Sequence, residues 1–128
     1  MILYGIKIRF DCKNNQQYKT IGNFWEYMRS SYPNYILKGV GCNWHDDCMD
    51  YIIGDFSPSN HYDMDVITKK YPTAEYIEIN LPDEGWQVYH CRLSELSKLY
   101  EEIYTDGVLK YEIEEMKLDG NCVISIIR

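Results

Sequence analysis

The sequence has little positive charge, and this shortage excludes a large class of functions. Its 13 lysines and arginines are outnumbered by 20 aspartates and glutamates, which gives a formal net charge of −7. Proteins that bind nucleic acid need clustered basic side chains to replace the counterions of the phosphates. The sequence contains no basic segment and no helix-turn-helix pattern, so we expect no direct nucleic-acid binding by this chain.

Long hydrophobic runs are also missing from the sequence. The apolar stretch at the start, Met1–Phe10, is interrupted by Lys7 and Arg9 and is too short for a signal peptide or a membrane span. The sequence therefore predicts a soluble, cytoplasmic protein with no membrane partner. Because a strand is expected almost directly after Met1, we also expect a standalone chain.

The sequence also lacks cysteine pairs at the spacing typical of metal-binding or redox motifs. The five cysteines lie far apart and form no C-x-x-C pair, which favours reduced thiols. The segment closest to a metal motif is Cys42–Cys48, but no second cluster completes a tetrahedral site. Residues Asn43–Asp47 within it are expected to form a hairpin turn, and neither a metal nor another cofactor is predicted.

Aromatic side chains, in contrast, are abundant. The chain contains 13 tyrosines and 3 tryptophans among 128 residues. These side chains combine a large apolar face with a polar tip, so they suit both cores and binding pockets. A chain of this length forms a single domain with one core, and we expect residues 1–128 to do so.

Hydrophobic periodicity predicts an α+β fold. Apolar residues alternate in the segments expected to be strands, and they recur every three or four residues at 18–28 and 93–104, where helices are expected. The order strand, helix, strand, strand occurs twice, in halves at about 1–56 and 74–128 joined by loop 57–73. With one helix covering each antiparallel sheet, the seam between the halves is a natural pocket. The strands are expected at 4–10, 35–44, 49–56, 76–79, 86–91, 109–118 and 122–127.

Two glycines mark the first of the strands that follow the first helix. Gly39 and Gly41 are two residues apart, so they lie on the same face of that strand. Paired glycines leave space that side chains would otherwise fill, or else mark a simple bulge or bend.

One predicted strand, Tyr111–Met116, combines apolar residues with three glutamates. An ionised carboxylate inside a core loses its hydration and is tolerated only with a partner. One interpretation places Glu112 and Glu114 on the water-facing side of an edge strand. The other interpretation places one glutamate, Glu114 first, in an aromatic pocket that awaits a cation. Glu115 shares a face with Ile113 and Glu114 shares a face with Met116, so Glu112 and Glu115 are alternatives.

Five segments, in order along the chain, resemble the GyrI-like family, which includes the effector-binding domains of AraC-type and MerR-type regulators and standalone relatives. Leu81–Tyr89 looks like the family's Ile-Pro-Ala-Gly-x-Tyr-x-Val-Phe segment, and Ile113–Met116 looks like its Phe-Glu-x-Tyr. Met116 stands where the family prefers an aromatic residue, and Trp86 replaces the usual tyrosine. The order and spacing of these short motifs carry the resemblance. The other matching segments are Ile21–Trp25, Gly39–Gly41 and Tyr51–Gly54.

The resemblance implies two βαββ units related by pseudo-twofold symmetry, with a cleft between them that binds hydrophobic, often cationic, drugs and dyes. In the family a buried glutamate meets the positive charge, and the matching residue here is Glu114. Tyr51 and Trp86 match aromatic residues of the pocket, and Trp25 matches a tryptophan of the first helix. Tyr104 is added from its position on the second helix alone.

The function expected first is that of a small-molecule binding module for hydrophobic cations, with a sensor or sequestering role linked to transcription regulation or drug response. If the protein regulates transcription, its DNA-binding partner is a separate chain. A second possibility is an enzyme, because some standalone family members hydrolyse reactive cyclopropane-containing natural products with the glutamate that Glu114 matches. A third is inhibition of DNA gyrase, the role of the family's founding member, for which the acidic net charge is the support.

Overall fold

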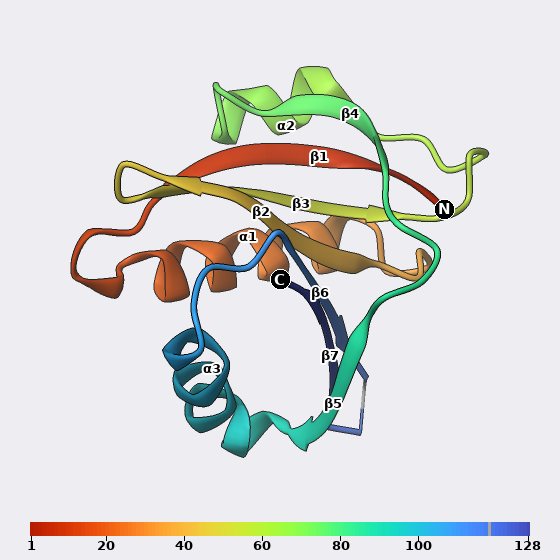
Figure 1. Ribbon diagram of the computed structural model, residues 1–128. Helices are drawn as coiled ribbons and strands as arrows, with labels where there is room; N and C mark the ends of the chain where they lie inside the picture. The colour runs from red at the N-terminus through yellow and green to blue at the C-terminus, as the bar shows by residue number, and fades with distance from the viewer. Residues whose placement is uncertain (118) are drawn as a thin grey trace.

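The structure is a computed structural model that describes residues 1–117 and 119–128. In these residues the chain forms seven strands, three α-helices and two short 3₁₀ turns (Figure 1). The predicted end of one strand at Leu118 lies outside the described residues. The elements are β1 (Ile2–Asp11), η1 (Lys13–Asn15), α1 (Gln17–Ser31), β2 (Lys38–His45), β3 (Cys48–Asp55), α2 (Met64–Lys70), β4 (Glu75–Asn80), β5 (Gln87–Arg92), η2 (Leu93–Glu95), α3 (Leu96–Thr105), β6 (Tyr111–Met116) and β7 (Asn121–Ile127).

The described strands form a single antiparallel sheet in the order β4-β1-β3-β2-β6-β7-β5. The prediction of separate sheets that meet along a seam is corrected here, because β2 and β6 pair directly. Gly39 lies opposite Glu114 and Gly41 lies opposite Glu112. On either side of this junction, β1-β3-β2 and β5-β7-β6 repeat one pairing order. Strand pairing does not measure a rotation axis, so pseudo-twofold symmetry between the two segments stays a prediction.

The two long helices, α1 and α3, pack against the sheet. Figure 1 shows α1 running beneath β1 and β3, while α3 faces the strands β5, β6 and β7 across the lower part of the molecule. Both helices form because apolar residues recur on one side and can be buried there. None of the described helices is long and apolar enough to span a membrane. The buried side chains are Phe24, Trp25 and Met28 in α1 and Tyr100 and Ile103 in α3.

The segment 57–73, which was predicted to be a loop, contains the helix α2. The Asp63 carboxylate caps this helix by accepting a hydrogen bond from the backbone N–H of Val66, and Ile67 is fully buried. α2 has only seven residues. A helical pattern this short does not stand out from the polar composition around it, and packing rather than intrinsic propensity stabilises such a helix.

β4 was predicted to open the second half, but it pairs with β1 and forms one edge of the sheet. Figure 1 shows α2 and β4 together beside β1. The chain then passes through residues 81–86 to the opposite edge, where β5 begins the second strand-helix-strand-strand segment. The two segments therefore meet at β2 and β6, in the middle of the sheet.

The two hairpin turns expected from the sequence are confirmed. β2 and β3 are joined by Asp46 and Asp47, both with positive φ angles (50° and 59°). The β6–β7 hairpin contains Gly120, with a φ of 84°. Asparagine, aspartate and glycine tolerate this left-handed backbone better than other residues, which is why these turns were recognisable.

Candidate ligand-binding site

Two glutamates of β6 are buried beneath the helices. Glu112 is 2% exposed and Glu114 is 7% exposed. Because they are two residues apart on a strand, both point to the same face of the sheet. The interpretation that they face water is therefore wrong. Glu115 points to the opposite face, is half-buried, and forms an ion pair with Lys38 (Nζ to Oε1, 2.9 Å).

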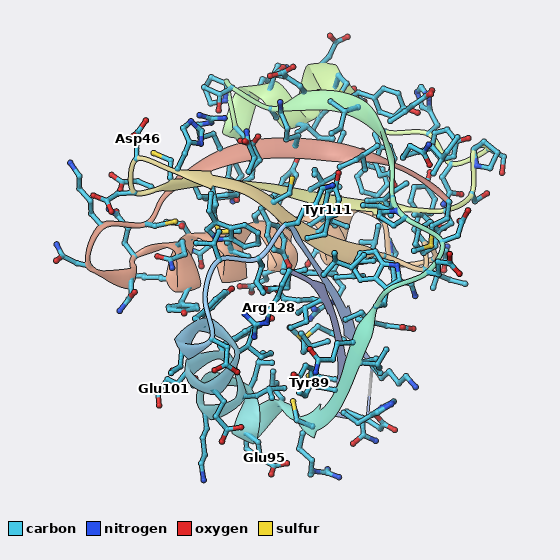
Figure 2. All side chains as sticks on the ribbon, viewed as in Figure 1. Asp46, Tyr89, Glu95, Glu101, Tyr111 and Arg128 are labelled. Carbon is cyan, nitrogen blue, oxygen red and sulfur yellow. The ribbon has the colours of Figure 1, made fainter. Side chains whose placement is uncertain are left out.

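A cavity of about 260 Å³ lies between α1, α3 and these glutamates. Its wall is mainly apolar and aromatic, and no lysine, arginine or histidine occurs among the described residues that line it. Acids elsewhere on this side, such as Glu95 and Glu101, are exposed and do not line the cavity (Figure 2). The cavity therefore concentrates negative charge in an enclosed space without supplying a positive partner.

A chain of hydrogen bonds reaches Glu114 from α1 through β3. The Trp25 indole N–H donates to the Tyr51 hydroxyl oxygen (2.8 Å), and the Tyr51 hydroxyl donates to Oε1 of Glu114 (2.9 Å). All three side chains line the cavity. Because each group is fixed by the next, the carboxyl group of Glu114 is held in one orientation toward the cavity.

Gly39 makes this arrangement possible. On β2 it lies opposite Ile53 of β3 and Glu114 of β6, and the side chain of Tyr51 from β3 reaches over it. A Cβ atom at Gly39 would overlap the Tyr51 hydroxyl and lie 2.8 Å from the Trp25 ring. The space that the sequence predicted beside Gly39 is therefore filled by the rings that position Glu114, and the space beside Gly41 is filled by Met49 and Trp44.

Glu112 is contacted mainly by tyrosines of α3. The Tyr104 hydroxyl donates to Oε2 of Glu112 (2.5 Å), and the Tyr100 ring stacks on the Tyr104 ring with centroids 5.7 Å apart. Tyr100 is 6% exposed. Its hydroxyl has no hydrogen-bond partner among the described residues. A buried phenol without a partner is unusual and indicates a group that a ligand or solvent can satisfy.

Burial changes the acidity of both glutamates. It is the main cause that raises the pKa of Glu112 to about 8; the charge of Glu114 raises it further, and the hydrogen bond from Tyr104 opposes the increase. Burial likewise raises the pKa of Glu114, while the hydrogen bond from Tyr51 lowers it in part. Glu112 therefore keeps its proton near neutral pH, and burial makes both carboxyls weaker acids than exposed glutamates.

The structure brings together four of the five residues predicted for the site. Glu114, Trp25, Tyr51 and Tyr104 line one cavity. Trp86 does not reach it. Its ring packs against Tyr111 on the other face of the sheet (centroids 6.4 Å apart), and its indole N–H donates to the Pro82 carbonyl oxygen (2.8 Å). Trp86 precedes β5 at the end of the crossing segment, so the path of that segment determines its face.

Several lining residues were not identified from the sequence. Tyr100 could have been found, because it stands four residues before Tyr104 and thus on the same helical face. Glu112 was kept as an alternative, and its spacing from Glu114 required the two to share a face. The remaining ones carry no chemical signal of their own; they include Gln17, Tyr18, Met49, Leu96 and Met116.

The segment Cys42–Cys48 contains the β2–β3 turn, as predicted. In the part of the chain that the structure describes, no three His, Cys, Asp or Glu side chains are placed to hold a metal ion. Cys42 is buried, and burial raises its pKa to about 11, which favours an unreactive thiol.

The class of structure is thus an α+β domain with one antiparallel sheet and an acidic cavity beneath two helices. No family model and no curated protein sequence matches this chain. Among solved structures, the fold is similar to that of SAV2435 bound to tetraphenylphosphonium, with a TM-score of 0.64 and 14% identity over 98% of this chain and 87% of that chain. This similarity supports the GyrI-like fold expected from the motifs. At such low identity it shows the fold alone, so function has to be argued from the cavity.

Proposed function

We propose that this protein binds hydrophobic cations in the cavity between α1, α3 and β6. The observation that carries the proposal is the buried pair Glu112 and Glu114, which is enclosed by rings without any basic side chain among the described lining residues. A buried carboxylate is costly unless it is paired, and here the missing partner has room to enter. The similar structure, SAV2435, is bound to tetraphenylphosphonium, a hydrophobic cation.

The binding energy would come from three sources. Glu114 supplies the negative charge and is already oriented by Tyr51. The faces of aromatic rings that line the cavity, such as Tyr104, add cation–π attraction of roughly 0.5–2 kcal/mol each. One face of Trp25 already carries the Arg29 guanidinium, 5.3 Å from the ring centroid. Burial of the ligand's apolar surface adds about 25 cal/mol per Å² before losses of freedom are subtracted. Because apolar stacking tolerates differences in shape, we expect broad specificity and about micromolar dissociation constants.

A ligand larger than the cavity has space to extend outward. A second hollow of about 570 Å³ adjoins the cavity and shares Gly22, Trp25, Leu93 and Met116 with it. Gly22 is exposed and has no atom near the place where a Cβ would stand, so this side of α1 does not obstruct entry. Bulky ligands would therefore place their charge beside Glu114 and their outer rings in this hollow.

This binding would serve a sensor or sequestering role in the cytoplasm, in drug response or transcription regulation. In that proposal the two strand-helix-strand-strand segments are related by a pseudo-twofold axis, and the cavity lies where they meet at β2 and β6. If transcription is regulated, a partner chain binds the DNA, because this chain has a net charge of −7 and DNA binding requires clustered basic side chains.

The proposal is tested with Glu114→Gln, which removes the charge and keeps the shape. Tetraphenylphosphonium and neutral triphenylphosphine oxide are titrated by calorimetry into the wild type and the variant. We expect affinity for the cation to fall at least about tenfold and affinity for the neutral compound to change less than about threefold. Glu115→Gln is the matched control, because Glu115 lies on the same strand but points to the other face and pairs with Lys38. Equal weakening of both compounds would show that Glu114 does not recognise charge.

A second candidate function is favoured by one observation. The buried carboxyls of Glu112 and Glu114 lie on one face of β6, and burial raises the pKa of Glu112 to about 8, so Glu112 is suited to give a proton and Glu114 to accept one, as a general acid and a general base do. This pair could hydrolyse a reactive cyclopropane in the cavity: Glu114 would take a proton from the attacking water, and Glu112 would protonate the carbon released when the ring opens. Incubation with an electrophilic cyclopropane decides the matter, because an enzyme consumes many equivalents of substrate and a binding protein consumes none.

A further inference from the structure

The cavity contains one more carboxyl group than a singly charged ligand needs. Glu112 and Glu114 both reach the cavity from the same face of β6, and each accepts one hydrogen bond from a different tyrosine. A third phenol, that of Tyr100, is buried and makes no hydrogen bond among the described residues. Although its geometry falls outside an ordinary hydrogen bond, the Tyr100 hydroxyl acts as a donor toward both carboxyls and lowers the pKa of each. One carboxyl group beyond what a monocation needs and one phenol shared between the two carboxyls thus lie in the same cavity.

The groups that face the pair are neutral on every surrounding element. They are Tyr18 of α1, Tyr51 of β3, Tyr100 and Tyr104 of α3, and Cys122 of β7, while β2 presents the glycines Gly39 and Gly41. Burial raises the pKa of each of these phenols and of the thiol, so all of them stay protonated at neutral pH. A second negative charge on the pair can therefore be balanced from outside the protein, by the ligand.

We propose that the cavity accepts flat aromatic dications as well as monocations, and that Glu112 keeps its proton for a monocation and releases it for a dication. Glu112 and Glu114 are two residues apart on one face of β6, and their carboxyl groups lie within hydrogen-bonding distance of each other. A second positive charge on the ligand can therefore act on the carboxyl that keeps its proton. The Tyr100 hydroxyl then donates to the newly ionised Glu112. This inference rests on the proposed function, because it concerns the charge of the ligand that the same cavity binds.

Proton release separates the two ligand classes because it follows from the number of charges rather than from shape. A monocation is neutralised by Glu114 and leaves the protonated Glu112 unchanged. A dication stabilises the ionised form of Glu112 and so shifts its proton to the solvent, which makes the affinity for the dication rise with pH. Below the pKa of Glu112, the affinity for the dication would rise up to about tenfold per pH unit, while that for the monocation would stay nearly constant.

The test uses two probes of nearly the same shape. Methyl viologen is a flat bipyridinium with two positive nitrogens at opposite ends, and 1-methyl-4-phenylpyridinium has one of these charges replaced by a neutral ring. Each is titrated into the wild type by calorimetry at pH 7 in phosphate and in Tris, whose different ionisation heats report the protons released. We expect methyl viologen to release about one proton more than the monocation.

Two variants assign the effect to residues. Glu112→Gln should abolish the additional proton release and lower the affinity for methyl viologen about tenfold, with the monocation changing less than about threefold. Tyr100→Phe keeps the ring and removes a hydroxyl that has no partner in the described residues, so the fold should be unaffected. It should weaken methyl viologen more than the monocation.

The outcomes separate this inference from the proposed function. If tetraphenylphosphonium binds in a Glu114-dependent way but both pyridinium probes release equal numbers of protons, the dication inference is wrong and the proposed function stands. If methyl viologen fails to bind while the monocation binds, the inference is again wrong. If none of the three cations binds, the proposed function fails and the inference fails with it.

Discussion

Within the described residues the protein buries four acids, and it does so in two contrasting ways. Asp50 and Asp55, near the two ends of β3, are matched by donors from the chain itself. Asp50 accepts hydrogen bonds from the guanidinium of Arg9 (Nε to Oδ1, 3.0 Å) and from the amide of Asn43 (2.9 Å). Asp55 accepts three hydrogen bonds, two of them from backbone N–H groups. The hydrogen-bonding needs of these two aspartates are therefore met by the protein itself, without a ligand.

Glu112 and Glu114 differ because, within the described residues, they are met by neutral phenols and by each other rather than by a cation or a backbone N–H group. No cation contacts either carboxyl among the described residues, and the space beside them is a cavity. Burial alone therefore does not distinguish a structural acid from a ligand-binding one. The distinguishing feature is whether the fold itself provides the donors and the positive charge that a buried carboxylate requires.

The contrast between the paired aspartates and the unpaired glutamates can be tested by several variants. The largest effect is expected on how the stability of the folded protein depends on pH. Because burial raises the pKa of Glu112 from 4.5 to about 8 in the folded protein, the folded state holds this proton more tightly than the unfolded chain. The contribution is fully present below pH 4.5, and it is lost as the pH rises through about 8. The Glu112→Gln variant lacks this pH-dependent contribution to stability. The difference between wild type and variant in free energy of unfolding should change by roughly 3 kcal/mol from pH 5 to pH 9, in favour of the variant at high pH.

The measurement is urea unfolding of both proteins at several pH values. Glu115→Gln serves as the control, since Glu115 is on the same strand and is partly exposed. Its stability curve should run parallel to that of the wild type. If the Glu112→Gln curve is also parallel, Glu112 is hydrated in the folded state, and the contrast with the aspartates disappears.

The next largest effect is the loss of stability when Asp50 loses its ion-pair partner Arg9. Arg9→Met leaves the buried Asp50 without its guanidinium partner. We expect a loss of about 2 kcal/mol in the free energy of unfolding, less than for a fully buried pair because the Arg9 side chain is 46% exposed. Tetraphenylphosphonium affinity should change less than about twofold, since the pair faces away from the cavity.

Lys7→Met is the matched control for this change. Lys7 lies on the same strand and face as Arg9, but its partner Glu75 is 64% exposed and 3.8 Å away. Loss of this surface pair should cost less than about 1 kcal/mol in urea unfolding. Equal losses for the two variants would mean that Asp50 does not depend on Arg9.

Local sequence patterns were sufficient for the hairpins and the long helices, and they singled out the strand that carries the candidate acid Glu114. The Asn43–Asp47 and Asp119–Gly120 segments contain the residues that left-handed turns require, and α1 has a continuous apolar stripe. Glu114 was identified because an acid on an otherwise apolar strand needs a reason. These features depend on residues close together in the sequence, where spacing alone fixes which side chains share a face.

Other features depend on contacts between distant segments. The pairing of β2 with β6 joins residues more than 70 positions apart, Gly39 with Glu114, and no local pattern specifies it. The same limit explains Trp86, whose face depends on how residues 81–86 cross the sheet. Whether Asp50 or Glu112 has a partner could not be predicted, because Arg9 and Tyr104 reach them only after the sheet and helices have assembled.

The smallest effect concerns the hydrogen bond that the fold does give to Glu112. Tyr104→Phe removes the phenol that donates to Oε2 and that lowers the pKa of this carboxyl. The pKa of Glu112 should therefore rise further, so that the pH at which stability is lost moves up by about half to one unit. The titration of the Glu112 carboxyl carbon, followed by NMR, measures this shift directly. Tyr89→Phe is the control, because it removes a half-buried phenol on β5 outside the cavity. An unchanged titration in Tyr104→Phe would mean that the hydrogen bond from Tyr104 does not influence the proton affinity of Glu112, and that burial and the neighbouring groups set it without Tyr104.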